Sequence, residues 1–132
     1  MKKIIYIETP KGSFVKRNEQ QRIDFISPLP CPFNYGHIKG EVGGDGDPLD
    51  VLLLGESVPL GTELSAQIVG CVYFIDCGKQ DDKLIAVQIG EPSKTDKRNI
   101  KLFFHFYALL KRFSASLRGS SCQSAVLNIE YY

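Results

Sequence analysis

Short apolar runs separated by glycine, proline and polar residues make up the chain as far as residue 89. Residues 3–9, 21–26, 63–75 and 83–89 are rich in branched and aromatic side chains, which is typical of β-strands. Residues 50–54 contain a continuous apolar run, which predicts a strand buried on both faces. Two further expectations follow: residues 13–17 pair back as a hairpin, and residues 36–46 form a glycine-rich loop.

The period of the apolar positions changes in the last third of the sequence. A spacing of i, i+3, i+4, i+7 and i+11 predicts a helix over residues 97–112, through Ile100, Phe103, Phe104, Tyr107 and Lys111. A second helix is predicted after Ser120 or Ser121 as N-cap, through Cys122, Ala125, Val126 and Ile129. The expected fold is α+β, a small twisted antiparallel β-barrel flanked by two C-terminal helices, because closure removes the exposed edges of short strands.

Composition limits the possible classes of protein. The 132 residues are long enough for one domain, residues 1–132, with its own core. A net charge of +1 argues against binding nucleic acid or a membrane surface through bulk charge. We find no apolar run long enough to span a bilayer and no signal-peptide pattern, so a cytoplasmic location is expected. The four cysteines lack C-x-x-C spacing and are expected to be free thiols.

Three carboxylates occur within six residues at Asp45, Asp47 and Asp50. In a regular strand Asp45 and Asp47 would point the same way, about 6–7 Å apart. Gly46 and Pro48 allow the backbone to bend and bring Asp50 toward the other two. Carboxylates held this close favour hard cations such as Mg²⁺, Mn²⁺ or Ca²⁺. An acidic surface turn is the alternative, but it does not explain why an apolar run starts directly after Asp50.

A second acidic cluster is expected at the turn between residues 63–75 and 83–89. A four-residue loop there predicts an antiparallel hairpin with Asp76 and Asp81 facing each other, about 5 Å apart. Lys83 lies two residues beyond Asp81 and shares its face. The spacing therefore predicts a metal and anion site, with a charged hairpin tip as the plain alternative.

Two segments form a specific pattern: Asn34-Tyr35-Gly36-His37-Ile38 and Asp45-Gly46-Asp47-Pro48-Leu49-Asp50-Val51. In these segments the chain resembles the soluble family I inorganic pyrophosphatases, and the likeness can be followed from about residue 4 to residue 107. The resemblance implies an OB-like barrel that hydrolyses pyrophosphate to two phosphates with several Mg²⁺ ions, for which Mn²⁺ could substitute. It implies metal ligands at Asp45, Asp50, Asp76, Asp81 and Glu8. It also implies that substrate and attacking water are handled by Asp47, Tyr35, Lys16, Arg22, Lys83 and Tyr107, with Asp47 as the proton acceptor.

The sequence departs from the family pattern at several places. Arg22 is one residue out of step, Cys31 replaces a tyrosine, and Ala108 stands where many bacterial members have a lysine. Lys111 lies one helical turn after Tyr107, so we expect it to supply part of the missing charge.

Two other functions fit parts of the pattern. One is a pyrophosphatase-like barrel that binds metal without catalysis. The other is an OB-like nucleic-acid binder, which would need a basic groove where the sequence shows carboxylates. For a pyrophosphatase the expected partner is pyrophosphate, with no nucleic acid and no membrane. The resemblance also implies a homo-oligomer.

Overall fold

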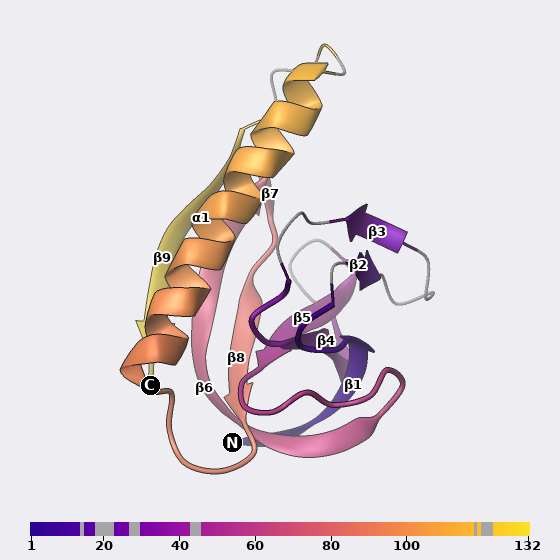
Figure 1. Cartoon of the computed structure of the whole chain (residues 1–132), viewed down its shortest axis with the longest axis vertical. Helices are drawn as coiled ribbons and strands as arrows, with labels where there is room; N and C mark the ends of the chain where they lie inside the picture. The colour runs from indigo at the N-terminus through magenta and orange to yellow at the C-terminus, as the bar shows by residue number, and fades with distance from the viewer. Residues whose placement is uncertain (14, 18–22, 27–29, 43–45, 118, 120–122) are drawn as a thin grey trace.

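A computed structural model of the 132-residue chain describes all residues except 14, 18–22, 27–29, 43–45, 118 and 120–122. One layer is a strongly curved sheet, and a single long helix lies across one side of it (Figure 1). The elements of the described residues are β1 (Lys2–Thr9), β2 (Val15–Arg17), β3 (Ile23–Ile26), β4 (Asn34–Val42), β5 (Pro48–Leu53), β6 (Glu63–Asp76), β7 (Lys79–Gln80), β8 (Lys83–Val87), α1 (Lys94–Leu117) and β9 (Ser124–Tyr131).

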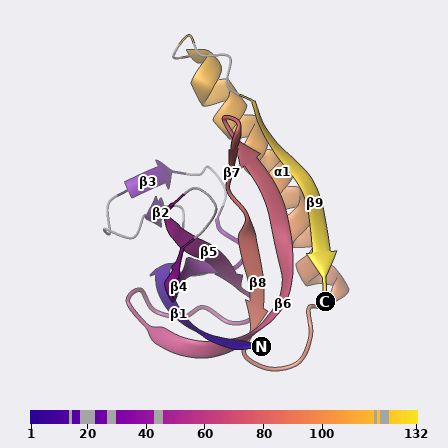
Figure 2. The ribbon, with the colours of Figure 1, turned by 180° about the vertical axis from the view of Figure 1, so that it is seen from behind.

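Five strands form a closed barrel. They pair in the order β1-β4-β5-β8-β6, and β6 pairs again with β1 to close the ring. The long β6 strand curves under the barrel and continues up beside β9 (Figure 2). All pairs in the ring are antiparallel except β5 with β8, which is parallel. The expected α+β barrel is therefore confirmed in outline, but the barrel is mixed and not purely antiparallel.

Two apolar clusters hold the barrel and the helix together. Alternate residues of β5 belong to different clusters: Val51 and Leu53 pack in the first, and Leu52 packs in the second. The first cluster contains β1, β4, β6 and β8 side chains such as Ile5 and Ala86, and the second includes Phe104 of α1. Burial on both faces explains why residues 51–53 of β5 are continuously apolar and do not alternate.

Helix α1 is longer than the predicted residues 97–112. Ser93 starts it as the N-cap: its Oγ accepts from the Asp96 N–H at 3.0 Å, and the Asp96 carboxylate accepts from the Ser93 N–H at 2.9 Å. Ile100, Phe104 and Tyr107 are buried against the barrel, as their helical spacing predicts.

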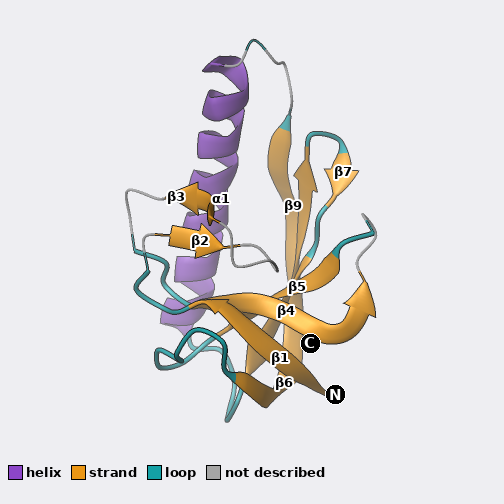
Figure 3. Cartoon of the chain, turned by 90° about the vertical axis from the view of Figure 1, so that its right-hand side faces the viewer, coloured by secondary structure: helices purple, strands orange, loops and turns teal. Residues whose placement is uncertain are grey.

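The predicted second helix is wrong, since Ser124–Tyr131 form strand β9. β9 pairs with β6 over most of its length, and Figure 3 shows it running along the open edge of that strand. Val126, Ile129 and Tyr131 pack on the core, with one register shift opposite Tyr73 and Phe74. The spacing of these apolar residues resembles a helical period. Without β9, however, one edge of β6 would lack hydrogen-bond partners, and such an edge favours pairing with another strand.

Two local expectations are also corrected. Residues 36–42 of the expected glycine-rich loop belong to strand β4, and β2 pairs with β3 in a separate two-stranded sheet instead of with β1. Gly36 belongs in β4 because a Cβ at this position would collide with the carbonyl oxygen of Tyr6 on β1. A side chain there would push the two strands apart, so glycine is required by close packing and not by a loop.

The expectation of four free thiols is wrong at Cys77, which is disulfide-bonded, whereas Cys31 and Cys71 are free and buried. The β6–β9 pairing extends to Cys77, whose N–H donates to the Gln123 carbonyl at 2.9 Å.

Within the described residues, no helix has the length and apolarity needed to cross a membrane.

Candidate active site

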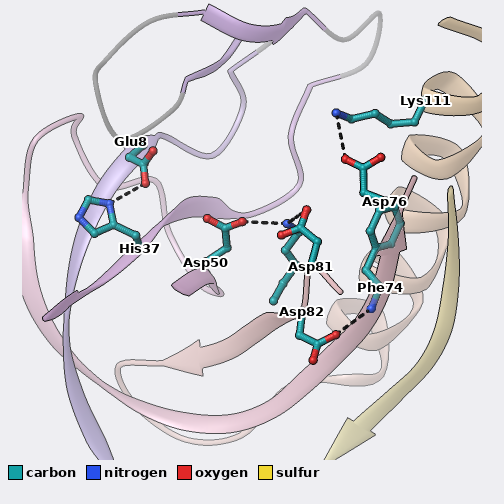
Figure 4. Close-up of polar contacts among 9 residues, drawn as sticks. Glu8, His37, Asp50, Phe74, Asp76, Asp81, Asp82 and Lys111 are labelled. Carbon is teal, nitrogen blue, oxygen red and sulfur yellow. Dashed lines mark hydrogen bonds and ion pairs between the residues drawn. The ribbon is translucent and has the colours of Figure 1, made fainter. Parts of the chain in front are cut away.

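Lys83 is the centre of the polar site. It begins β8 and its side chain is only 1% exposed, with Nζ 2.8 Å from Asp50 Oδ2 and 2.8 Å from Asp81 Oδ2. The parallel pairing of β5 with β8 sets Asp50 opposite Lys83. Figure 4 shows the Asp50 and Asp81 carboxylates turned toward the same point, Asp50 from β5 and Asp81 from the segment between β7 and β8. One buried ammonium therefore holds together two carboxylates that would otherwise repel each other.

Tyr35 lies directly beside this group. Its ring centroid is 5.9 Å from Lys83 Nζ, and the residue is 2% exposed. Burial raises the pKa of the Tyr35 hydroxyl well above 10, and the negative charge of Asp50, the neighbouring Tyr107 and Asp81 raise it further. Tyr35 is therefore a neutral hydroxyl at ordinary pH, able to donate to an anion.

The β6–β7 turn differs from its prediction. Asp76 pairs with Lys79 and Ile75 with Gln80, so the turn contains only Cys77 and Gly78, both with positive φ. Asp76 therefore does not face Asp81 across the hairpin. The shorter turn arises because Cys77 adopts a left-handed conformation that is uncommon for residues other than glycine.

Asp76 has its own partners. Ser124 Oγ donates to Asp76 Oδ1 at 2.9 Å, and Lys111 Nζ lies 3.5 Å from Asp76 Oδ2. Lys111 also lies 5.4 Å from the centroid of the Tyr107 ring, which is buried. Asp76, Tyr107 and Lys111 thus form a second group beside the first, and Figure 4 shows Lys111 reaching from α1 toward Asp76.

Glu8 lies on β1 and is 3% exposed. Its Oε1 is 2.7 Å from Nδ1 of His37 on β4, and the His37 ring also packs against Tyr6 at a centroid distance of 5.3 Å. The sequence pattern did not assign His37 a partner, because only the β1–β4 register brings the two side chains together. The one sequence feature that pointed to a site role for His37 was its position directly after Tyr35-Gly36.

Several predicted site residues cannot be located in full. Asp45 and Arg22 lie outside the described residues, and Lys16 is described only as part of the β2 backbone. Asp47 is exposed just before β5.

Asn34, the first residue of the Asn-Tyr-Gly motif, is buried, and its side-chain oxygen accepts hydrogen bonds from the backbone N–H groups of Lys11 and Val58. It therefore fixes the loops that surround Tyr35.

The carboxylates present fit a hard divalent cation. Asp50 and Asp81 offer oxygen ligands only and remain 26% and 21% exposed, so a cation can reach them from solvent. In the described part of the chain, no three His, Cys, Asp or Glu side chains are grouped closely enough to hold a metal by themselves. Asp45, which the sequence analysis predicts as a further metal ligand, lies outside the described residues.

The fold and this group of residues define a small α+β barrel with an acidic, lysine-centred site. A family model described as inorganic pyrophosphatase matches residues 5–120. Since that match covers most of the chain, the protein belongs to the inorganic pyrophosphatase family.

Individual relatives agree with this assignment. The chain is 36% identical over 107 residues to an inorganic pyrophosphatase of Saccharolobus solfataricus, covering 74% of this chain and 62% of the relative. It is 39% identical over 103 residues to a soluble inorganic pyrophosphatase of Oryza sativa, covering 72% and 48%. Among solved structures, an inorganic pyrophosphatase from Helicobacter pylori matches with a TM-score of 0.76 and 25% identity, over 97% of this chain and 83% of that one. The matched part of the two sequence relatives is thus less than two thirds of their own length.

Proposed function

We propose that the chain catalyses hydrolysis of inorganic pyrophosphate to two orthophosphates and depends on Mg²⁺, with Mn²⁺ as a substitute. The observation that carries the proposal is the meeting of Asp50 and Asp81 at the buried ammonium of Lys83, 2.8 Å from each. The family resemblance implies a site role for all three residues, with Asp50 on β5, Lys83 on β8 and Asp81 in the segment just before β8. A purely structural ion pair would not need two partly exposed carboxylates beside a neutral tyrosine hydroxyl.

Each residue has a distinct proposed part. Asp45, Asp50 and Asp81 would hold the catalytic Mg²⁺, which supplies charge neutralisation and lowers the pKa of a bound water. Asp47 accepts the proton of the attacking water, and its exposure leaves it open to solvent. The substrate oxygens are bound by Lys16, Arg22, Lys83, Tyr35 and Tyr107. Glu8 would serve as a further metal ligand, and its contact with His37 supports this by orienting the carboxylate.

Phosphate release from pyrophosphate, measured with and without Mg²⁺, tests the proposal. We expect release that requires Mg²⁺ and is abolished in Asp50→Asn, while the exposed Glu91→Gln variant stays unchanged. Mg²⁺ binding without any release would instead support the metal-binding barrel that lacks catalysis. Retention of single-stranded nucleic acid at physiological salt would support the OB-like binder, although partly exposed carboxylates disfavour a phosphodiester backbone.

A homo-oligomer is also proposed, because α1 carries an apolar stripe on its solvent side. The stripe consists of Leu102, Leu109, Phe113 and Leu117, each more than half exposed. Their spacing of i, i+7, i+11 and i+15 sets them on one face of the helix. A second copy of the chain would bury this stripe against its own equivalent.

A cytoplasmic location is proposed from the relatives whose printed names call them soluble. The disulfide at Cys77 argues the other way, because such bonds are rare in a reducing cytosol. Alkylation of thiols in freshly lysed cells, followed by mass measurement, separates the two locations. A reduced Cys77 supports the cytoplasm, and a protected Cys77 contradicts it.

A further inference from the structure

The inference concerns Asp82, the residue between Asp81 and Lys83, and it rests on the proposed function. Oδ1 of Asp82 accepts from the Phe74 N–H of β6 at 3.2 Å, and Oδ2 accepts from the side-chain amide of Gln80. Figure 4 shows the Asp82 carboxylate directed at the Phe74 backbone nitrogen and away from the Asp81 carboxylate. Asp82 therefore contacts the backbone of the sheet, whereas its neighbours on both sides face the site.

The hairpin between β6 and β8 is interrupted at residues 81–82. These two residues belong neither to β7 nor to β8. Ile75 pairs with Gln80 on one side of the interruption, and Val72 pairs with Lys83 on the other. Each strand advances by three residues between these pairs, so the register is the same on both sides. The interruption is thus a local change in hydrogen bonding and not an inserted residue.

The Asp82 side chain supplies the hydrogen bond that the interruption removes. In a regular antiparallel hairpin Phe74 and Asp81 would exchange two backbone hydrogen bonds. The Asp81 N–H does donate to the Phe74 carbonyl at 2.9 Å, but the Phe74 N–H donates to Asp82 Oδ1. Phe74 is fully buried and packs against the rings of Phe104 and Tyr107, with centroid distances of 6.2 and 5.7 Å. Residues 81–82 are therefore attached at two points to a rigid part of the core.

We propose that Asp82 is a positioning residue that aims the Asp81 carboxylate at Lys83 and at the metal site. The Asp81 carboxylate lies 2.8 Å from the Lys83 ammonium, and its direction depends on how residues 81–82 leave the hairpin. Without the Asp82 oxygen the buried Phe74 N–H lacks an acceptor, unless the segment returns to regular pairing. Either change turns the Asp81 side chain from its present direction.

Calorimetric titration with Mn²⁺ tests the proposal without any turnover. Asp82→Ala should weaken Mn²⁺ binding by about 10-fold, the usual effect of removing a group that orients a metal ligand. Asp82→Asn keeps an oxygen at the same place and should bind Mn²⁺ as wild type does. Asp82→Glu keeps the charge, but its longer side chain displaces the oxygen, so it should bind Mn²⁺ more weakly.

Glu130→Ala is the matched control, because Glu130 is an exposed carboxylate on the neighbouring strand β9. The negative charges of Asp82 and Glu130 both act on Cys71 and raise the pKa of its thiol, so the two carboxylates lie in the same region of the sheet. Removing the Glu130 charge should leave Mn²⁺ affinity unchanged.

A double variant shows whether Asp82 acts through Asp81. In an Asp81→Asn background, Asp82→Ala should cause no further loss of Mn²⁺ affinity. Wild-type affinity in both Asp82→Ala and Asp82→Glu overturns the proposal. Equal losses in Asp82→Asn and Asp82→Ala also overturn it, since charge and not position would then matter. So does a full additional loss in the double variant. A wild-type chain that binds Mn²⁺ but releases no phosphate refutes the proposed function and leaves the positioning role of Asp82 supported by these variants.

Discussion

The ammonium of Lys83 lies equally close, at 2.8 Å, to one carboxylate oxygen of Asp50 and one of Asp81. Asp50 lies on β5 and Asp81 lies in the segment just before β8, and the lysine side chain is almost completely buried. The cation therefore has two tasks that can be separated by experiment. It stabilises the fold by neutralising the carboxylates, and it adds positive charge where the substrate is expected to bind.

Lys83→Met should lower the free energy of unfolding by about 3 kcal/mol, the low end for a broken buried ion pair, because Asp50 and Asp81 are partly exposed. Added Mg²⁺ should restore more stability in this variant than in wild type, since two unpaired carboxylates attract the cation. Urea denaturation with and without Mg²⁺ measures both effects. Lys39→Met breaks an exposed pair with Glu63 and should cost less than about 1 kcal/mol. Equal losses in the two variants would contradict the central role of Lys83.

Asp47→Asn should keep Mn²⁺ binding and lower kcat by about 10²-fold or more, because an amide cannot accept the proton of the attacking water. Calorimetry with Mn²⁺ and a phosphate-release assay measure the two quantities on the same preparation. If Mn²⁺ binding is lost and the rate at saturating metal is normal, Asp47 is a plain ligand instead of the proton acceptor.

Tyr35 should make stability depend on pH in the alkaline range. Its pKa is raised well above 10 in the folded chain, so the folded state keeps a proton that the unfolded state loses. The stabilisation is complete below pH 10, the unfolded pKa, and decreases as the pH rises toward the folded pKa. Urea denaturation from pH 9 to 11 should therefore show falling stability, with a shallower fall in Tyr35→Phe. Cys71, with a pKa of about 11, accounts for part of the remaining slope. Identical slopes in the two proteins would rule out this contribution of Tyr35.

The apolar stripe of α1 should govern assembly. Leu109→Glu introduces a charge at its centre and should shift the protein toward a monomer in gel filtration with light scattering. The basic residues Lys94, Arg98, Lys101 and Arg112 are exposed on the same helix, so higher salt should favour wild-type assembly by screening them. Leu60→Glu, an exposed leucine before β6, is the control and should leave the mass unchanged. A monomeric wild-type chain at high salt would refute the proposed oligomer.

Local patterns in the sequence were enough to predict a β-barrel, the helix through Ile100, Phe104 and Tyr107, and the doubly buried strand β5. Each depends on a periodicity or a continuous run that a chain imposes on itself. The candidate site residues came mainly from the resemblance of two short segments to one family. Sequence spacing correctly suggested that Asp81 and Lys83 lie together, since they are two residues apart.

Only the tertiary structure decided which distant partners these residues meet. Register on β5 and β8 set Asp50 against Lys83, and register on β1 and β4 set Glu8 near His37. The last segment shows the same limit: residues 124–131 carry a spacing compatible with a helix, yet they form β9. The free edge of β6 offered hydrogen bonds that the local pattern could not reveal, and the resulting strand set Ser124 beside Asp76. Hydrogen bonding between distant segments, and not local propensity, therefore shaped this part of the site.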